Sequence, residues 1–327
     1  DLDYFNKITK GGLPNKTLNV ALAGTGVGKS LFMCHVAAGA MVQGKNVLYI
    51  TMEMAEEKIA ERIDANLLNV TVDDLVNLPK DMYDKKVQRV KEMTVGKLII
   101  KEYPTKTAST SVIKNHLKRI VGAGQKVDMI IVDYGDLLNP TVRYKEKRTE
   151  LETIYEELRA IAMEFICPVW TASQTNRSGL NAEVVTMESI SEAFNKCFVA
   201  DFIFSVSRTV DDKKTNSGRI FIAKNRNGPD GIVMPLYMDT SVVKMEVLED
   251  KKPEDIIESV KTKKTRNKKQ EIFDKFSLQQ IKYGSIKNKD VFPLMIVSVL
   301  IVSISFYSSI KTFFRLRYLF CDHPHSF

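Results

Sequence analysis

The stretch that decides the fold is Ala23-Gly24-Thr25-Gly26-Val27-Gly28-Lys29-Ser30, between an apolar run and an amphipathic one. A phosphate-binding loop has a glycine, four free residues and then Gly-Lys-Ser/Thr, so this stretch departs from the pattern only at Ala23. The glycines allow backbone N–H groups to turn inward around an anion, and a helix beginning near Lys29 adds its positive end. Lys29 would reach the terminal phosphates and the Ser30 hydroxyl would hold Mg²⁺. Residues 24–30 are therefore predicted to bind a nucleoside triphosphate, such as ATP, with Mg²⁺.

Two other interpretations of the glycines remain open. The stretch could form an ordinary glycine-rich turn, or Gly24-Thr25-Gly26 could begin a dinucleotide-binding fingerprint. That fingerprint needs a third glycine at position 29, where this chain has lysine. The residues therefore favour a nucleoside triphosphate.

Around this loop, apolar strand-like runs alternate with helical periodicity up to about residue 170, which is typical of a parallel sheet covered by helices. Strands are expected at residues 18–23, 46–51, 97–103, 129–134 and 168–173, and helices at 29–43, 55–67, 111–121 and 149–165. Further strands are expected at 201–207, 219–225, 232–238 and 242–248, with hairpin signals at 216–218 and 227–231. The predicted fold is α/β, a mostly parallel sheet flanked by helices with antiparallel strands added at the C-terminal side.

The charge of the chain is uneven. The formal net charge is +8, and residues 251–327 account for all of it with 15 Lys and Arg against 7 Asp and Glu. Overall basicity therefore says nothing about what residues 1–250, the predicted ATPase domain, bind. Residues 251–290 read as a lysine-rich tail or linker, solvated or in contact with nucleic acid.

Residues 291–327 form an apolar terminal segment. No charged residue lies between Asp290 and Lys311, and residues 291–310 are long enough to span a bilayer. A membrane anchor is one interpretation. A segment that packs on a partner, or a reading frame that does not represent the working protein, are the others, and these are favoured over the anchor.

Cysteine and histidine use points away from a structural metal. Cys34, Cys167, Cys197 and Cys321 are far apart, without the paired spacing of zinc or redox motifs, and the four histidines show no ligand pattern. We expect free, mostly buried thiols and a cytoplasmic location, in the host cell if the chain is viral. The chain begins at Asp1 without a methionine, so we expect a fragment.

Two carboxylates follow predicted strands. Asp133 ends an apolar run and is placed to hold Mg²⁺ next to Ser30, although a strand-end acid that meets solvent is an alternative. Glu53 lies between two methionines at another strand end, where it could orient the attacking water or accept its proton. Alternatively, Glu53 opens the next helix.

Three further side chains complete the predicted catalytic set. Gln174 ends a strand and could bond the γ-phosphate or the attacking water, or simply form a turn. Lys224 and Arg226 lie two residues apart, hence on one face of a strand, where two cations are costly unless an anion meets them. Arg226 could act as an arginine finger on a neighbouring subunit's nucleotide, and a solvated pair at a hairpin is the alternative.

These elements occur in a fixed order, with residues 24–30 first: Thr51-Met52-Glu53-Met54, Ile131-Val132-Asp133-Tyr134, Ser173-Gln174-Thr175-Asn176-Arg177 and Ala223-Lys224-Asn225-Arg226-Asn227-Gly228-Pro229. The set resembles the motifs of the DnaB-type replicative helicases, in the form carried by tailed phages. The match covers about residues 1–240, and the Ala23 departure is shared in kind by that family. The resemblance implies a RecA-like P-loop NTPase core in a homo-hexamer that translocates on single-stranded DNA and unwinds duplex, with a primase and a helicase loader as partners.

By the same resemblance, Lys29, Ser30 and Asp133 bind nucleotide and Mg²⁺, Glu53 is the base, Gln174 senses the γ-phosphate, and Lys224 and Arg226 act in trans. The segment from Arg177 to residue 192 stands where a channel loop grips DNA. Arg143, Lys147 and Arg148 mark a second candidate DNA-binding segment. A surface turn explains either segment equally well.

Two other functions share this fold. A RecA-like recombinase or repair ATPase would form filaments on DNA, and a membrane-associated signalling ATPase would use residues 291–310 as its anchor. The element with Lys224 and Arg226 favours the helicase over the recombinase.

Overall fold

A computed structural model describes residues 3–93, 96–175 and 198–248, all within one compact unit, Asp1–Ser259. The strands in these ranges form one nine-stranded sheet in the order β3-β2-β4-β5-β1-β6-β7-β8-β9. The strands from β3 to β6 in that order run parallel, and β7, β8 and β9 follow as antiparallel neighbours. Their bounds are β1 Leu18–Ala23, β2 Val47–Thr51, β3 Leu98–Glu102, β4 Met129–Asp133, β5 Val169–Gln174, β6 Phe202–Ser207, β7 Ser217–Asn225, β8 Val233–Asp239 and β9 Lys244–Val247.

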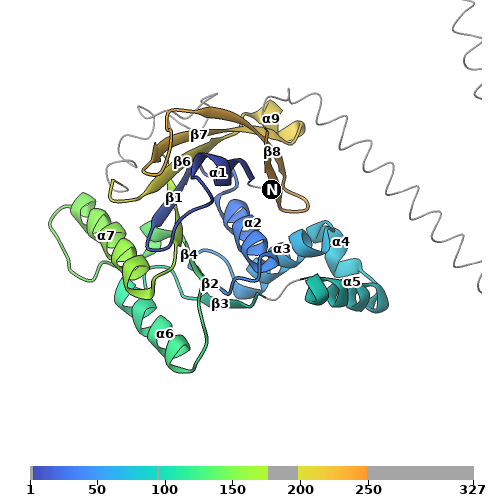
Figure 1. The fold of residues 1–327 in the computed structure, drawn as a ribbon, viewed down its shortest axis with the longest axis horizontal. Helices are drawn as coiled ribbons and strands as arrows, with labels where there is room; N and C mark the ends of the chain where they lie inside the picture. Colours follow the sequence, from blue (N-terminus) through green and yellow to red (C-terminus); the bar gives the residue numbers. More distant parts are fainter. Residues whose placement is uncertain (1–2, 94–95, 176–197, 249–327) are drawn as a thin grey trace, which may run out of the picture. The chain divides into compact units, whose positions relative to one another are not determined.

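Helices cover both faces of the parallel part. Figure 1 shows α6 and α7 on one face and α2 and α3 on the other. The helical segments of the described residues are α1 Asp3–Ile8, α2 Lys29–Val42, α3 Glu56–Leu68, α4 Val72–Asn77, α5 Lys80–Met93, α6 Thr110–Gly122, η1 Gly135–Leu137, α7 Lys147–Phe165 and α9 Val210–Lys214. The three-layer arrangement explains why β1 and β2 are buried along their whole length.

Successive side chains along each strand point to opposite faces of the sheet, so they contribute to two separate hydrophobic cores. Val20 packs in the core under α6 and α7, whereas its neighbour Ala21 packs in the core under α2 and α3. Phe32 of α2 is central to the second core, with ring centroids 4.8 Å from Phe204 and 5.5 Å from Trp170. The helix that follows the phosphate loop is therefore fixed to the middle of the sheet by aromatic packing.

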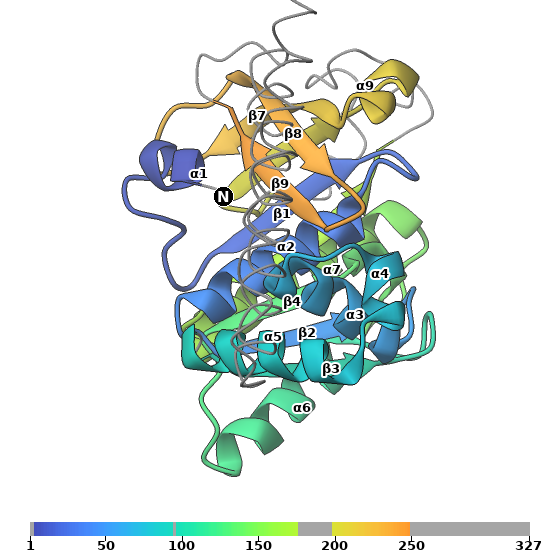
Figure 2. The same ribbon diagram turned by 90° about the vertical axis from the view of Figure 1, so that its right-hand side faces the viewer.

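The predicted strands and the four predicted helices are all present, within a few residues at each end. Helices α1, α4, α5 and α9 were not predicted. The period of α5 is visible in the sequence, because Tyr83, Val87 and Val90 recur at helical spacing in an otherwise charged stretch. Figure 2 shows α4 and α5 beside α3, and the Val72 backbone N–H at the start of α4 donates to the Ser241 carbonyl, between β8 and β9, at 2.9 Å.

The antiparallel pairing expected from the hairpin signal at residues 216–218 is present between β6 and β7, but the tight turn is not. The connection from β6 to β7 contains α9, and β7 already begins at Ser217. A reciprocal cap stabilises this short helix, because the Thr209 hydroxyl accepts from the Asp212 backbone N–H while the Asp212 carboxylate accepts from the Thr209 backbone N–H. The signal at residues 227–231 is correct, since β7 and β8 pair antiparallel across it.

Phe32→Ala should lower the free energy of unfolding by about 3–5 kcal/mol, because it leaves a cavity between α2 and the sheet. Urea unfolding followed by circular dichroism measures this. Val42→Ala on the same helix is the matched control, since Val42 is 50% exposed, and should cost less than about 1 kcal/mol. Equal losses in the two variants would contradict the role given to the aromatic core.

Candidate active site

The predicted phosphate loop joins β1 to α2. Gly26 (φ 70°) and Gly28 (φ 118°) adopt left-handed backbone conformations that favour glycine. At Gly28 a Cβ atom would also lie 2.0 Å from the Cε atom of Met238. Helix α2 has no side-chain cap at its N-terminus, so its first backbone N–H groups are available to an anion.

Lys29 lies in the first turn of α2 and turns back over the loop. Its Nζ donates to the carbonyl oxygens of Ala23 (3.4 Å) and Gly24 (3.3 Å) and lies 5.6 Å from the centre of the Tyr134 ring. Burial lowers the pKa of Lys29, and the nearby carboxylates of Glu53, Asp133 and Asp136 oppose that shift. The loop cation therefore lies within the field of three acids.

Asp133 ends β4 and is fully buried. Its Oδ2 accepts a hydrogen bond from the Tyr49 hydroxyl at 2.9 Å, whereas its buried Oδ1 has no hydrogen-bond partner. Burial raises the pKa of Asp133, and hydrogen bonding to the hydroxyls of Ser30 and Tyr49 opposes this. An oriented carboxylate oxygen beside a hydroxyl is a donor set that suits Mg²⁺, so these residues fit the predicted metal. Tyr49, which supplies the orientation, was not predicted from the sequence.

Glu53 lies in a bend directly after β2 and is exposed. The Thr51 hydroxyl bonds both backbone groups of Met54 (2.8 and 3.2 Å), and the Thr105 hydroxyl donates to the Met52 carbonyl at 2.7 Å. Helix α3 begins later, at Glu56, so Glu53 is not in its first turn. The bend thus presents Glu53 near Lys29, as a separate feature from the helix.

Gln174 is the last residue of β5, in register with Ala23 of β1. Its Nε2 donates to the hydroxyl of Thr25, in the middle of the phosphate loop. The structure therefore brings Gln174, Lys29, Asp133 and Glu53 to one edge of the sheet, where parallel strands end.

Lys224 and Arg226 lie at the opposite edge. Lys224 is in register with Ile203 near the start of β6, and Asn19 near the start of β1 is in register with Phe202. The phosphate loop follows the other end of β1, about 15–20 Å along the strand. The chain cannot bring Arg226 to its own phosphate loop without unpairing these strands.

The anion that meets Arg226 is Asp201, which the sequence analysis missed. Asp201 Oδ1 lies 3.1 Å from Arg226 Nη1, and Arg159 binds both carboxylate oxygens at 3.2 Å. The Leu18 backbone N–H donates to Oδ2 at 3.0 Å. Asp201 therefore holds Arg226 close to the start of β1, and the Arg226 side chain remains 46% exposed.

Lys224 has a different environment from Arg226. Its Nζ donates to the Phe198 carbonyl and lies 4.6 Å from the centre of that ring. Burial, followed by the positive charge of Arg226, lowers the pKa of Lys224. Lys224 is thus partly desolvated, whereas Arg226 is exposed.

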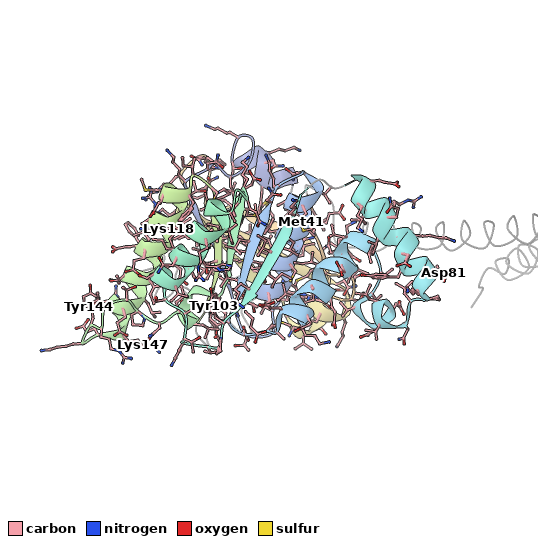
Figure 3. All side chains as sticks on the ribbon, turned by 90° about the horizontal axis from the view of Figure 1, so that it is seen from below. Met41, Asp81, Tyr103, Lys118, Tyr144 and Lys147 are labelled. Atoms are coloured by element: carbon pink, nitrogen blue, oxygen red, sulfur yellow. The ribbon has the colours of Figure 1, made fainter. Side chains whose placement is uncertain are left out.

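The second candidate DNA-binding segment covers the connection from η1 to α7, with Arg143, and the first turn of α7, with Lys147 and Arg148. Arg143 and Lys147 are exposed, and Arg148 is exposed and paired with Glu152 at 3.0 Å. Glu150 anchors the segment by accepting from the Tyr144 backbone N–H at 3.1 Å. Figure 3 shows Tyr144 and Lys147 where this segment projects from the domain. Arg177 and the remainder of the first candidate segment lie outside the described residues.

Other sequence predictions concern cysteines, metal clusters and membrane spans. Cys34 and Cys167 are free and buried, and burial raises the pKa of each thiol to about 12. Cys197, Cys321, the lysine-rich tail and residues 291–327 lie outside the described ranges. Within those ranges there is no cluster of three His, Cys, Asp or Glu side chains that could bind a metal, and no helix has the length and apolarity needed to cross a membrane.

Comparison with known proteins agrees with this architecture. The family model of the DnaB-like helicase C terminal domain matches residues 1–246. The DnaB-like replicative helicase of Enterobacteria phage T4 is 40% identical over 234 residues, which are 69% of this chain and 49% of that protein. The replicative DNA helicase DnaB of Geobacillus stearothermophilus is 28% identical over 238 residues, 69% of this chain and 52% of that protein. The chain thus spans about half the length of these relatives.

Solved structures show the same fold. One solved ATPase domain matches with a TM-score of 0.64 at 18% identity, covering 76% of this chain and 89% of that one. A DnaB-like replicative helicase, studied with its interactions with primase, also matches at 0.64 and 18%, covering 76% and 61%. The predicted RecA-like fold is confirmed, and neither the recombinase nor the signalling alternative is favoured. Since the family model covers residues 1–246, the chain belongs to the DnaB-like helicase C-terminal domain family.

Proposed function

We propose that this chain is the ATP-driven motor of a replicative DNA helicase. It would hydrolyse ATP at sites shared between neighbouring subunits of a homo-hexamer, translocate on single-stranded DNA and unwind duplex. The location would be cytoplasmic, in the host cell if the chain is viral. A primase is proposed as a further partner, because one structural neighbour is a helicase studied with its primase interactions. A helicase loader is proposed from the family resemblance alone.

One observation carries the shared site. Lys29, Asp133 and Gln174 lie at one edge of the sheet, while Arg226 lies at the other. A cation that stabilises charge on the transferred phosphate must lie beside the nucleotide. In a second copy of the chain, the strand ends that carry Arg226 and Lys224 would face the phosphate-loop end of the first copy and supply both cations to it.

Each residue has a proposed part in the reaction. The backbone N–H groups of residues 24–30 and Lys29 would hold the phosphates, and Ser30 and Asp133 would hold Mg²⁺, which neutralises phosphate charge when bound. Glu53 would orient the attacking water and accept its proton. Gln174, in contact with Thr25, would sense the γ-phosphate.

DNA would contact the exposed segment with Arg143, Lys147 and Arg148. Cationic side chains bind backbone phosphates without reading sequence, which suits a motor that moves along any strand. The segment follows β4 and η1, so it starts only a few residues after Asp133. The segment from Arg177 is proposed to contribute as well.

Arg226→Ala should leave ATP binding nearly unchanged but lower hydrolysis about a thousandfold, as expected for an arginine finger. Binding of a fluorescent nucleotide and steady-state turnover with single-stranded DNA measure the two effects. Mixing Arg226→Ala with Glu53→Ala subunits should restore part of the activity, because some interfaces then contain both groups. Arg89→Ala on α5 is the control for removal of an exposed arginine. Absence of rescue at every mixing ratio would count against a shared site.

Tyr49→Phe should weaken Mg²⁺ binding about 10–100-fold, because it removes the hydrogen bond that orients Asp133. The measurement is the Mg²⁺ concentration that half-saturates binding of a fluorescent ADP analogue. Tyr83→Phe removes a hydroxyl from α5 and should change nothing. An unaltered Mg²⁺ requirement in Tyr49→Phe would exclude the proposed orientation of Asp133.

Replacing both Arg143 and Lys147 by alanine should weaken binding of single-stranded DNA roughly tenfold at moderate salt. The slope of log affinity against log salt should fall by about 1.4, because two phosphate contacts are lost. Fluorescence anisotropy of a labelled oligonucleotide measures both. The matched control replaces Lys85 and Arg89, two exposed cations of α5, by alanine. A similar loss in the control would show that only net charge matters.

A further inference from the structure

The strands β4 and β5 are joined in two different ways along their length. Backbone pairing runs from Ile130 with Val169 to Val132 with Thr171. Beyond that point the two strands are joined by hydrogen bonds of side chains. The Thr171 hydroxyl donates to the Val132 carbonyl at 2.8 Å and accepts from the Gly135 backbone N–H at 2.9 Å. The ends that carry Asp133 and Gln174 are therefore connected by side-chain hydrogen bonds.

Asp136 forms the centre of this connection. Its Oδ2 accepts from the Ser173 hydroxyl at 3.0 Å and from the Gln174 backbone N–H at 3.4 Å. Its Oδ1 accepts from the Tyr155 hydroxyl at 2.8 Å. One carboxylate thus links η1, the end of β5 and the middle of α7. Hydrogen bonds to a charged acceptor are stronger than those between neutral groups, so we expect Asp136 to hold these three elements together.

The link connects two regions to which the proposed function gives different tasks. On one side, Gln174 bonds Thr25 of the phosphate loop. On the other, η1 leads into the exposed segment, which is tied to the body where the Asn139 backbone N–H donates to the Ala108 carbonyl at 2.8 Å and the Thr141 hydroxyl donates to Glu157 at 3.1 Å. A displacement of the Gln174 backbone must either carry Asp136 with it or break two hydrogen bonds.

We propose that Asp136 is a positioning residue that sets the place of Gln174 beside the phosphate loop and transmits its displacement through η1 to residues 139–148. The inference rests on the proposed function and adds the residue through which nucleotide state reaches the DNA-binding segment. Energetic coupling between sites is carried by contiguous hydrogen-bond networks of this kind. The coupling is measured as the ratio of DNA affinities in two nucleotide states.

The test compares Asp136→Ala and Asp136→Asn with the unaltered protein in assembled form. Affinity for a labelled single-stranded oligonucleotide is measured at fixed salt with a non-hydrolysable ATP analogue and with ADP. The unaltered protein should show a ratio on the order of tenfold. Asp136→Ala should reduce the ratio below about twofold while nucleotide binding changes less than about threefold. Asp136→Asn keeps an acceptor for Ser173 and Gln174 and should recover most of the ratio.

A matched control and the opposing outcomes keep the two proposals distinguishable. Asp211→Ala removes an exposed carboxylate from α9 and should retain the full ratio. A full ratio in Asp136→Ala would overturn the positioning role and leave the motor proposal intact. Absence of any DNA binding or ratio in the unaltered protein would overturn the motor proposal, and this inference with it. If Asp136→Ala does not fold, the test rests on Asp136→Asn. The asparagine keeps an oxygen that accepts from Ser173 and Gln174, so the proposal requires most of the affinity ratio to remain. A ratio below about twofold in folded Asp136→Asn would then overturn the inference.

Discussion

The hydrogen-bonded pairing of β1 with its parallel neighbours β5 and β6 is the constraint on which the rest depends. Parallel pairing places Ala23 beside both Gln174 and Val206, so the functional strand ends share one edge of the sheet. The antiparallel return of β7 then carries Lys224 and Arg226 to the other edge. A single pattern of backbone hydrogen bonds therefore brings together most of the residues proposed to bind and hydrolyse nucleotide, and it separates Lys224 and Arg226 from them.

Electrostatics at the two edges follow opposite designs. At the phosphate-loop edge, Lys29 lies near the carboxylates of Glu53, Asp133 and Asp136. A bound anion would therefore meet both positive and negative side chains there. At the other edge, Asp201 pairs with both Arg159 and Arg226, and a backbone N–H from β1 also donates to its carboxylate. Arg226 is thereby held in a defined place and remains half exposed, which is compatible with its proposed role on a neighbouring subunit.

Much of the fold and part of the site could be predicted from local patterns. The glycines and Lys29 mark the phosphate loop, and the apolar runs ending in Asp133 and Gln174 mark strand ends. The short helix α9 was missed because its cap, Thr209 with Asp212, sits within a polar stretch that reads as a turn. The DNA contact predicted for Arg177 and the interpretations of residues 291–327 remain predictions, since these residues lie outside the described ranges.

The sequence by itself determined the order of the strands and helices along the chain and the residues proposed to bear the chemistry, because loop, strand and helix signals depend on neighbours within a few positions. Tertiary structure alone decided how those residues are oriented. Tyr49 and Asp133 are 84 positions apart, Leu18 and Asp201 183, and Asp136 and Gln174 38. No short-range pattern can reveal such pairs, because a hydroxyl or carboxylate finds its buried partner only after the sheet has set the strand order.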